Sequence, residues 1–319
     1  MKRRHLIALL AALCMLLSAL PALAAPWKST DHLDFRYVDA EEARELILSR
    51  DTFYAQVNQK SLDYFTQKKN ATMEEFKELC AQQVLDVSPE CRQRLDEAVA
   101  GLEEEMYKRG IRVPEIGQIR IVVSKMGDAL GAAGYTSDDV IYLFEDCILQ
   151  YELADLENLL AHELAHCMSR KCPEYREAMY SLIHFRMLGH EIEIPDEIYS
   201  QVIANPDVEH HDSVATFTVD GKPEECYLVF LCDGEFEKPG DSFFSTMKSG
   251  VVTLDGNRLF YADDVPDFYD VVGRNTTYCE DPEECMATNL AFAMAGAAPD
   301  SGTYETPELI EGILKLLSE

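Results

Sequence analysis

Basic residues are scarce in this sequence. Its 319 residues include 28 lysines and arginines against 58 aspartates and glutamates, which gives a formal net charge of −30. A surface of this sign repels phosphate backbones and anionic lipids, so we expect neither nucleic acid nor an anionic membrane as a partner. The same charge would keep an exported protein soluble, and it could also attract basic peptides.

Long apolar runs are missing everywhere except at the start of the chain. There, three basic residues precede a mostly apolar stretch from His5 to Leu20, and Ala22-Leu23-Ala24 follows it. This order predicts a secretory signal peptide over residues 1–24, cleaved before Ala25. An uncleaved membrane anchor is the alternative, because the stretch nearly reaches the length that spans a bilayer. We therefore expect a secreted or extracytoplasmic protein without membrane insertion after cleavage, whose 25 basic and 58 acidic residues give a formal charge of −33.

Cysteine pairs of the C-x-x-C type are also missing, which removes support for a zinc ribbon or a thioredoxin-like redox motif. Nine cysteines follow the predicted signal peptide. In an exported protein we expect some of them to form disulfides, while the odd number leaves at least one unpaired. Cys226 and Cys232 cannot pair with each other, because they end a predicted strand whose ends lie about 20 Å apart. The nine are Cys80, Cys91, Cys147, Cys167, Cys172, Cys226, Cys232, Cys279 and Cys285.

No low-complexity linker or internal repeat divides the mature chain, and its length suits one large domain or two lobes. Helical patterns, then strand patterns, then helices again predict an α+β fold with a small mixed sheet in its middle. The predicted segments are a helical N-terminal region (25–114), the sheet with the helix that follows it (115–195), a β-rich insertion (196–275) and a C-terminal helical region (276–319).

Turn and capping signals locate the individual elements. Helices are predicted at 40–49, from Thr72, from Ser88 to Arg109, at 282–295 behind Asp281, and after Thr306. Strands are predicted at 118–124, 132–136, 140–144, 213–219, 226–232, 250–254 and 258–261. The small-residue segment Gly131–Thr136 is a candidate edge strand that could pair with an extended peptide, and a plain hairpin corner is the alternative.

One short motif points to chemistry, namely His162-Glu163-Leu164-Ala165-His166, an H-E-x-x-H. In a helix its two histidines lie on one face about 6 Å apart, so both imidazoles can bind one Zn²⁺ and the glutamate can act as general base. A surface helix with two solvated histidines is the alternative. The predicted helix has Asp155 as N-cap, Arg170 and Lys171 in its last turn, and Leu156, Leu160, Leu164 and Met168 facing a core.

A catalytic zinc usually has three protein ligands, so a third must lie elsewhere in the chain. Cys172 lies close behind the motif, and two further histidines, His184 and His190, follow in the next segment. A thiol is more often buried or disulfide-bonded than catalytic, and a lone histidine is more often structural, so these three are weaker candidates.

Glu284 is the favoured third ligand. The segment Asp281-Pro282-Glu283-Glu284 places it in the first turn of an apolar helix, where an unpaired carboxylate would be costly. A capping box, in which Glu284 reaches back to the backbone of Asp281, is the alternative. Thr288 lies one turn further on and could accept a hydrogen bond from a ligating imidazole.

An H-E-x-x-H followed far downstream by a helical glutamate resembles the gluzincin metallopeptidases. In that group the second helix often carries E-x-x-x-D, whereas this chain has Glu284-x-x-x-Thr288. More widely, the chain is similar to a family of bacterial zinc-dependent proteins with the same signature. The resemblance implies a zincin-like fold, Zn²⁺ held by His162, His166 and Glu284, and Glu163 as catalytic base. The stretches that carry it are 42–51, 131–136, 161–170, 194–197, 205–207, 273–276 and 282–289.

These patterns lead us to expect a secreted zinc-dependent peptidase that acts on a peptide or protein substrate. Two other functions stay open. The chain could be a non-catalytic zinc-binding protein of the cell surface that uses residues 196–274 for a partner, or a zymogen in which residues 26–110 cover the cleft and a cysteine occupies the zinc. The candidate donors to a reaction oxyanion are Tyr278, His210, His211 and Arg274.

Overall fold

Helices and strands are mixed along the chain, with 46% of residues in helices and 19% in strands, which confirms the α+β class. The computed structural model describes residues 25–125, 132–296 and 302–318. The predicted signal peptide (1–24) and Gly131 lie outside the described residues. None of the helices in the described ranges is both long enough and apolar enough to cross a bilayer.

A mixed sheet lies at the centre of the fold, as predicted. Its strand order is β2-β5-β7-β6, with β2, β5 and β7 parallel and β6 antiparallel to β7 at one edge. The short β3 pairs with the far end of β5. Side chains alternate between the two faces of the sheet, so Ile121 enters one core cluster and Val122 the other. The strands are β2 (Phe35–Tyr37), β3 (Val84–Leu85), β5 (Ile119–Ser124), β6 (Gly134–Ser137) and β7 (Val140–Phe144).

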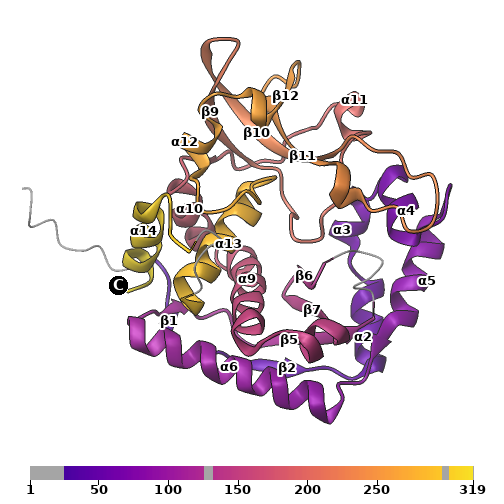
Figure 1. Cartoon of the computed structure of the whole chain (residues 1–319), viewed down its shortest axis with the longest axis vertical. Helices are drawn as coiled ribbons and strands as arrows, with labels where there is room; N and C mark the ends of the chain where they lie inside the picture. Colours follow the sequence, from indigo (N-terminus) through magenta and orange to yellow (C-terminus); the bar gives the residue numbers. More distant parts are fainter. Residues whose placement is uncertain (1–24, 126–131, 297–301, 319) are drawn as a thin grey trace, which may run out of the picture.

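The long helices α6 and α9, together with shorter ones, cover one face of this sheet and form the larger core (Figure 1). The central helix α9 packs against both α13 and α6, so residues that are far apart in sequence meet beside the sheet. Leu102, Ile121, Phe217 and Leu290 all belong to this core, and they come from the four predicted segments in turn. The helices are α6 (Pro89–Arg109), α8 (Glu145–Gln150), α9 (Leu153–Lys171), α10 (Pro173–Ser181), α13 (Pro282–Ala295) and α14 (Pro307–Leu317).

Four shorter helices cover the other face, on the right of Figure 1. They pack Phe53, Phe65 and Phe76 against Tyr135 and Tyr142 of the sheet to form a second core. Phe230 and Phe243 join the same cluster from the later half of the chain. The helices are α2 (Ala40–Leu48), α3 (Asp51–Gln56), α4 (Gln59–Thr66) and α5 (Met73–Gln83).

A second, antiparallel sheet stands above these layers at the top of Figure 1, in the order β12-β11-β10-β9-β8. Asp220 and Gly221 both have positive φ at the tight turn between β9 and β10, as the predicted hairpin turn requires. The β-rich character of this region is confirmed. Its elements are β8 (Arg186–Met187), α11 (Asp196–Tyr199), β9 (Ser213–Val219), β10 (Lys222–Cys232), η1 (Phe243–Thr246), β11 (Met247–Thr253), β12 (Leu259–Tyr261), η2 (Ala262–Asp264) and α12 (Phe268–Val272). A separate two-stranded pair joins β1 (Ser29–Thr30) to β4 (Val113–Pro114).

The capping predictions are mostly confirmed. Thr72 forms a capping box with Glu75, Ser88 caps α6, and Asp281 caps α13. Asp155 as the N-cap of α9 is wrong: the carbonyl of Glu152 already accepts the Leu156 amide at 3.1 Å, so the helix starts at Leu153. Asp155 instead lies in the first turn, where the helix dipole favours a carboxylate.

Thr306 occupies the N-cap position of α14, but its side chain does not cap the helix. Its hydroxyl accepts the backbone amide of Arg274 at 2.8 Å instead, which ties the chain before α13 to the start of the last helix. The predicted closing helix is therefore present without the predicted cap.

None of the nine described cysteines forms a disulfide, so the expectation of disulfides is not met in this structure. Cys226 and Cys232 lie on the same strand, β10, as predicted. The sulfurs of Cys279 and Cys285 lie 3.3 Å apart, and the Cys279 thiol donates a hydrogen bond to Cys285.

Candidate metal centre

Helix α9 presents the H-E-x-x-H motif beside the sheet. Leu156, Leu160, Leu164 and Met168 are fully buried in the larger core, as the spacing predicts. The motif histidines lie on a different side of the helix. His166 is completely buried, whereas the side chain of His162 keeps 18% of its surface exposed and lines a cavity.

The two imidazoles and Glu284 meet at one point. The Nε2 atoms of His162 and His166 lie 3.2 Å apart, and Oε2 of Glu284 lies 3.2 Å from the first and 3.6 Å from the second. Ligands bonded to zinc at 2.0–2.1 Å in a tetrahedron are separated by about 3.3 Å. The three atoms therefore have the spacing of one face of a zinc coordination tetrahedron, and this donor set fits a metal ion.

Helix α13 brings Glu284 to this point from 118 residues beyond His166. The alternative of a capping box is wrong, because Asp281 bonds the amide of Glu283 while Glu284 turns to the imidazoles. The other oxygen of Glu284, Oε1, accepts hydrogen bonds from the Asn205 amide at 2.5 Å and the Tyr278 hydroxyl at 3.1 Å. The carboxylate is thus fixed with its second oxygen, Oε2, directed at the two imidazoles.

Charge and burial act in opposite directions on these groups. Burial would raise the pKa of Glu284, but the hydrogen bond to His162 and the charges of both histidines hold it below its ordinary value. Burial would lower the pKa of His162, but the bond to Glu284 and that carboxylate's charge raise it. The cluster therefore favours an ionised carboxylate beside the histidines.

The other candidate third ligands lie away from the cluster. Cys172 is the C-cap residue of α9, and its sulfur points to Glu174. His184 is exposed in a left-handed turn, and exposed His190 contacts the carbonyl of Leu188. None of these three belongs to a candidate metal group in the described ranges.

Glu163 lies beside the cluster with only 2% of its surface exposed. Thr136 of β6 donates its hydroxyl to Oε2 of Glu163 at 2.7 Å, which orients the carboxylate. Burial raises the pKa of Glu163, while the two motif histidines and the bond from Thr136 oppose that rise. A side chain at Gly134 would come within 2.9 Å of the Tyr142 carbonyl and 3.4 Å of the Glu163 carboxylate, so the strand can pass this close only with a glycine.

Glu283 is a residue of the site that the sequence reasoning did not assign. Its Oε1 lies 3.0 Å from Nδ1 of His166, and Ser169 and Tyr180 both donate to its carboxylate at 2.5 Å. Burial would raise the pKa of Glu283, but the bond to His166 and the charges of His166, Arg176 and Arg170 lower it to about 2. Glu283 therefore supplies the carboxylate that commonly orients a metal-ligating imidazole.

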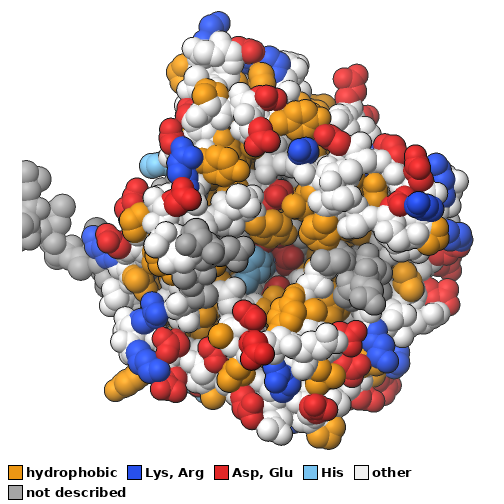
Figure 2. All heavy atoms as spheres, viewed as in Figure 1, with side chains coloured by type: hydrophobic (Ala, Val, Ile, Leu, Met, Phe, Trp, Pro, Cys, Tyr) orange, Lys and Arg blue, Asp and Glu red, His pale blue; other side chains and the backbone are white. Residues whose placement is uncertain are grey.

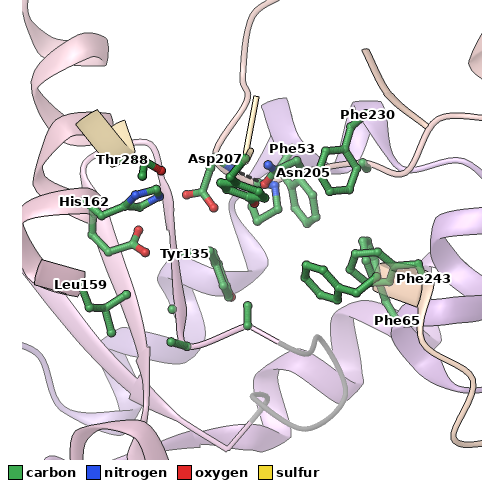
Figure 3. Close-up of a pocket in the computed structure, with 18 of the residues that line it drawn as sticks. Phe53, Phe65, Tyr135, Leu159, His162, Asn205, Asp207, Phe230, Phe243 and Thr288 are labelled. Atoms are coloured by element: carbon green, nitrogen blue, oxygen red, sulfur yellow. Dashed lines mark hydrogen bonds between the residues drawn. The ribbon is translucent and has the colours of Figure 1, made fainter. Parts of the chain in front are cut away.

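Thr288 does not take the predicted role. It lines the cavity near His162, but within the described ranges it makes no hydrogen bond to either motif histidine (Figure 3). The orienting carboxylate precedes the ligand on α13 instead of following it. The sequence carried a signal for this arrangement, namely the two adjacent acids Glu283 and Glu284 at the start of an apolar helix.

The loop after α11 adds two further polar residues to the site. Asn205 holds Glu284, and Asp207 accepts the backbone amide of Thr136 at 2.5 Å. Oδ1 of Asp207 also lies 3.9 Å from Nε2 of His166, and these two residues form a second candidate metal group with Glu163. Burial raises the pKa of Asp207 well above its ordinary value, and the charges of Glu163 and Glu284 add to this rise.

Strand β6 is the edge of the central sheet, as predicted, but much of that edge is covered. The carbonyl of Ala133 accepts from Phe144 of β7, so in an antiparallel pair Gly134 and Thr136 direct their backbone groups outward. The outward amide of Thr136 is bound by Asp207, and Glu209 binds the amide of Asp138. Within the described part of this edge, an extended peptide could therefore pair near Gly134, where neither carboxylate binds.

Of the four candidate oxyanion donors, Tyr278 alone lies at the site. Its hydroxyl bonds Glu284, and its ring centroid lies 6.5 Å from that of His162. His210 pairs with Glu191 on the surface, and Arg274 pairs with Asp270. His211 is directed to Asp281 at 3.8 Å, and burial lowers its pKa to about 4.

A cavity of about 550 Å³ opens from this cluster. In Figure 3, His162 and Thr288 lie at the left end, Asp207 and Tyr135 lie in the middle, and Phe65, Phe230 and Phe243 lie at the right end. Figure 2 shows the hollow from outside, with a histidine and acidic side chains inside a rim of hydrophobic ones. The early helices predicted to cover a zymogen's cleft contribute to this wall, and neither metal group in the described part of the chain includes a cysteine.

Comparisons of the chain with known protein families, with curated proteins and with solved structures gave no match. The function is therefore inferred from the geometry of the cluster and of its cavity.

Proposed function

We propose that this chain is a zinc-dependent peptidase of the gluzincin type, with a zincin-like arrangement of sheet, motif helix and ligand helix. The observation that carries the proposal is the meeting of His162, His166 and Glu284 at tetrahedral spacing beside an open cavity, whose wall includes His162. Glu163 lies on the same wall, one residue after the first ligand. A structural zinc site has four protein ligands and needs no such base, whereas a catalytic site has three and keeps one position open.

The donor set supports zinc. Two imidazole nitrogens and one carboxylate oxygen are ligands that Zn²⁺ accepts in catalytic sites, and the carboxylate–imidazole contact of Glu283 with His166 is the usual support for such a ligand. When bound, zinc would supply a Lewis acid that polarises a carbonyl and lowers the pKa of a water. The remaining chemistry belongs to side chains of this chain.

Glu163 is the general base of the proposal. Its carboxylate, held by Thr136, would accept a proton from the attacking water and deliver it to the leaving amine. Tyr278 is the donor best placed to stabilise the developing oxyanion, because its hydroxyl is at the cluster and its ring lines the cavity. Glu163 and Tyr278 both line the cavity that His162 lines.

The test is the variant Glu163→Gln, which retains size and removes the base. We expect it to bind one equivalent of zinc, measured by elemental analysis, and to lose at least about 100-fold of the hydrolysis of a mixed peptide library. His162→Ala should lose both zinc and hydrolysis. Undiminished hydrolysis by Glu163→Gln would contradict the mechanism, and the exposed change His190→Ala is the matched control.

A non-catalytic zinc protein is the second candidate, and Asp207 favours it. Its carboxylate lies 3.9 Å from Nε2 of His166, so a small movement could make it a fourth ligand and close the site. Against this, Asp207 already binds the Thr136 amide. In a closed site, Asp207→Asn would weaken zinc binding strongly and the wild type would hydrolyse no peptide. In an open one, chelator-sensitive hydrolysis is expected in the wild type.

A further inference from the structure

The end of the cavity far from His162 is lined by phenylalanines that converge from three parts of the chain. We call this end the aromatic compartment. Helices α3 to α5, strand β10 and the short helix η1 all contribute to it, and the phenylalanines at the right of Figure 3 belong to it. Its residues are Phe53, Phe65, Phe76, Phe230, Phe243 and Phe244.

The rings form one continuous wall. The ring centroid of Phe65 lies 5.4 Å from that of Phe76 and 5.9 Å from that of Phe243. Phe243 in turn stacks on Phe244 at 4.3 Å. Five of the six phenylalanines are buried, and Phe244 is half-buried. Such a preformed apolar surface gains free energy when an apolar group displaces water from it, at about 25 cal/mol for each Å² covered.

Arg50 lines the same cavity, and only 2% of its surface is exposed. Its guanidinium donates to the hydroxyls of Tyr135 and Tyr54 and to the carbonyl of Ile47. It also lies 5.0–5.3 Å from the centroids of four aromatic rings. Among the described residues no carboxylate pairs with it, so the compartment has a positive charge in its wall.

This charge discriminates between guests. A lysine or arginine side chain entering the compartment would lose its hydration and meet a like charge, at a large cost. An aromatic or aliphatic side chain contacts ring faces and has no charge whose hydration would be lost. The compartment therefore selects against basic side chains, whereas the acidic overall charge of the protein would favour basic peptides.

We propose that the aromatic compartment binds a large apolar side chain, such as phenylalanine, leucine or methionine, of the peptide substrate. This inference rests on the peptidase function proposed above, since the guest is part of the chain whose bond is cleaved. The compartment and Glu163 line a single cavity, and Gly134, where the sheet edge is open, lines it too. A peptide that reaches the cluster can thus place a nearby side chain among the phenylalanines.

Peptides that differ at a single position test the preference. The wild type should cleave those with phenylalanine or leucine at the preferred position with a kcat/KM at least about 100-fold higher than those with lysine. Phe244→Ala should lower kcat/KM for the phenylalanine peptide about tenfold. Phe260→Ala, in the same sheet region but outside the cavity, is the matched control and should leave it unchanged. If Phe244→Ala does not fold, Phe244→Gln keeps most of the volume and serves instead.

A binding measurement separates this inference from the proposed activity. Fluorescence anisotropy of a dye-labelled phenylalanine peptide with Glu163→Gln should give a Kd at least tenfold lower than that of the lysine peptide, and adding Phe244→Ala should reduce this difference by weakening the binding of the phenylalanine peptide. That result with an inactive wild type would support the compartment and overturn the peptidase. Hydrolysis without dependence on Phe244, together with equal binding of both peptides, would overturn the compartment and leave the peptidase standing.

Discussion

Glu283 holds His166 from the side opposite to the metal cluster. Its Oε1 lies 3.0 Å from Nδ1 of the ring, while Oε2 of its neighbour Glu284 lies 3.6 Å from Nε2 of the same ring. The ionised Glu283 accepts a hydrogen bond from Nδ1–H, which keeps the proton on Nδ1 and leaves the Nε2 lone pair directed at the cluster. Two consecutive acids of α13 thus fix both the orientation and the tautomer of one imidazole.

Glu283→Gln should therefore weaken zinc binding. Losing the ionised acceptor lowers the basicity of the imidazole, and changes of this kind typically cost 10–100-fold in metal affinity, so we expect a loss of about 30-fold. Competition with a chromophoric chelator measures it. Thr288→Val is the control, because Thr288 lines the cavity without bonding either histidine, and it should change the zinc affinity less than twofold. A larger loss of zinc affinity in Thr288→Val than in Glu283→Gln would show that the threonine orients the ligand after all.

The helix with the motif could be predicted from local signals alone. Its apolar spacing identified the buried side that includes Leu160 and Leu164, and the two histidines identified the other side. The start of the helix was misjudged because Asp155 is a strong cap by residue type, whereas the cap is decided by the backbone at Glu152. Residue type alone does not reveal which backbone carbonyl accepts the first hydrogen bond of the helix.

Contacts between distant segments were harder to predict. Glu284 could be predicted because an unpaired carboxylate in the first turn of an apolar helix is costly, but the sequence does not reveal that the neighbouring Glu283 binds His166. The roles of Asn205 and Asp207 depend on the loop after α11, a helix that packs against the second sheet, and no local sequence pattern specifies the position of that loop. The aromatic compartment has the same origin, since Phe53 and Phe243 meet only in the folded chain.

Zinc should stabilise the folded protein, because the three ligand atoms are gathered only in the folded state. At a free zinc concentration of about 100 times Kd, the gain is about 2.7 kcal/mol, which corresponds to a rise in Tm of about 5 °C for a chain of this size. Differential scanning fluorimetry with and without a chelator measures the shift. His162→Ala should remove it, and His190→Ala should retain it. A shift that survives His162→Ala would place the zinc elsewhere.

Glu280 should make the fold less stable in alkaline solution. It is 4% exposed, its Oε2 has no hydrogen-bond partner in the described part of the chain, and burial raises its pKa to about 8. Below pH 4.5 both the folded and the unfolded states carry the proton, so the group has no effect on stability. As the pH rises from there to 8, the unfolded state ionises first, and stability is lost.

Glu280→Gln removes this loss. We expect the free energy of unfolding to rise by about 3–5 kcal/mol at pH 8.5 and to change little at pH 4. Urea denaturation at the two pH values measures the difference, and the exposed change Glu308→Gln is the control. An equal effect of Glu280→Gln at both pH values would show that packing, not ionisation, explains it.

Thr136 should affect the rate of catalysis more than substrate binding. Its hydroxyl donates to Oε2 of Glu163 at 2.7 Å, and Thr136 is itself fully buried in β6. Thr136→Val keeps the shape and removes this donor, so the base loses its fixed orientation. We expect kcat to fall about tenfold with KM changed less than twofold, because an interaction with the base alone does not hold the substrate. Thr136→Ser restores the hydroxyl and should recover most of the rate, whereas a deficient serine variant of normal Tm would mean that the methyl group, not the hydrogen bond, positions Glu163.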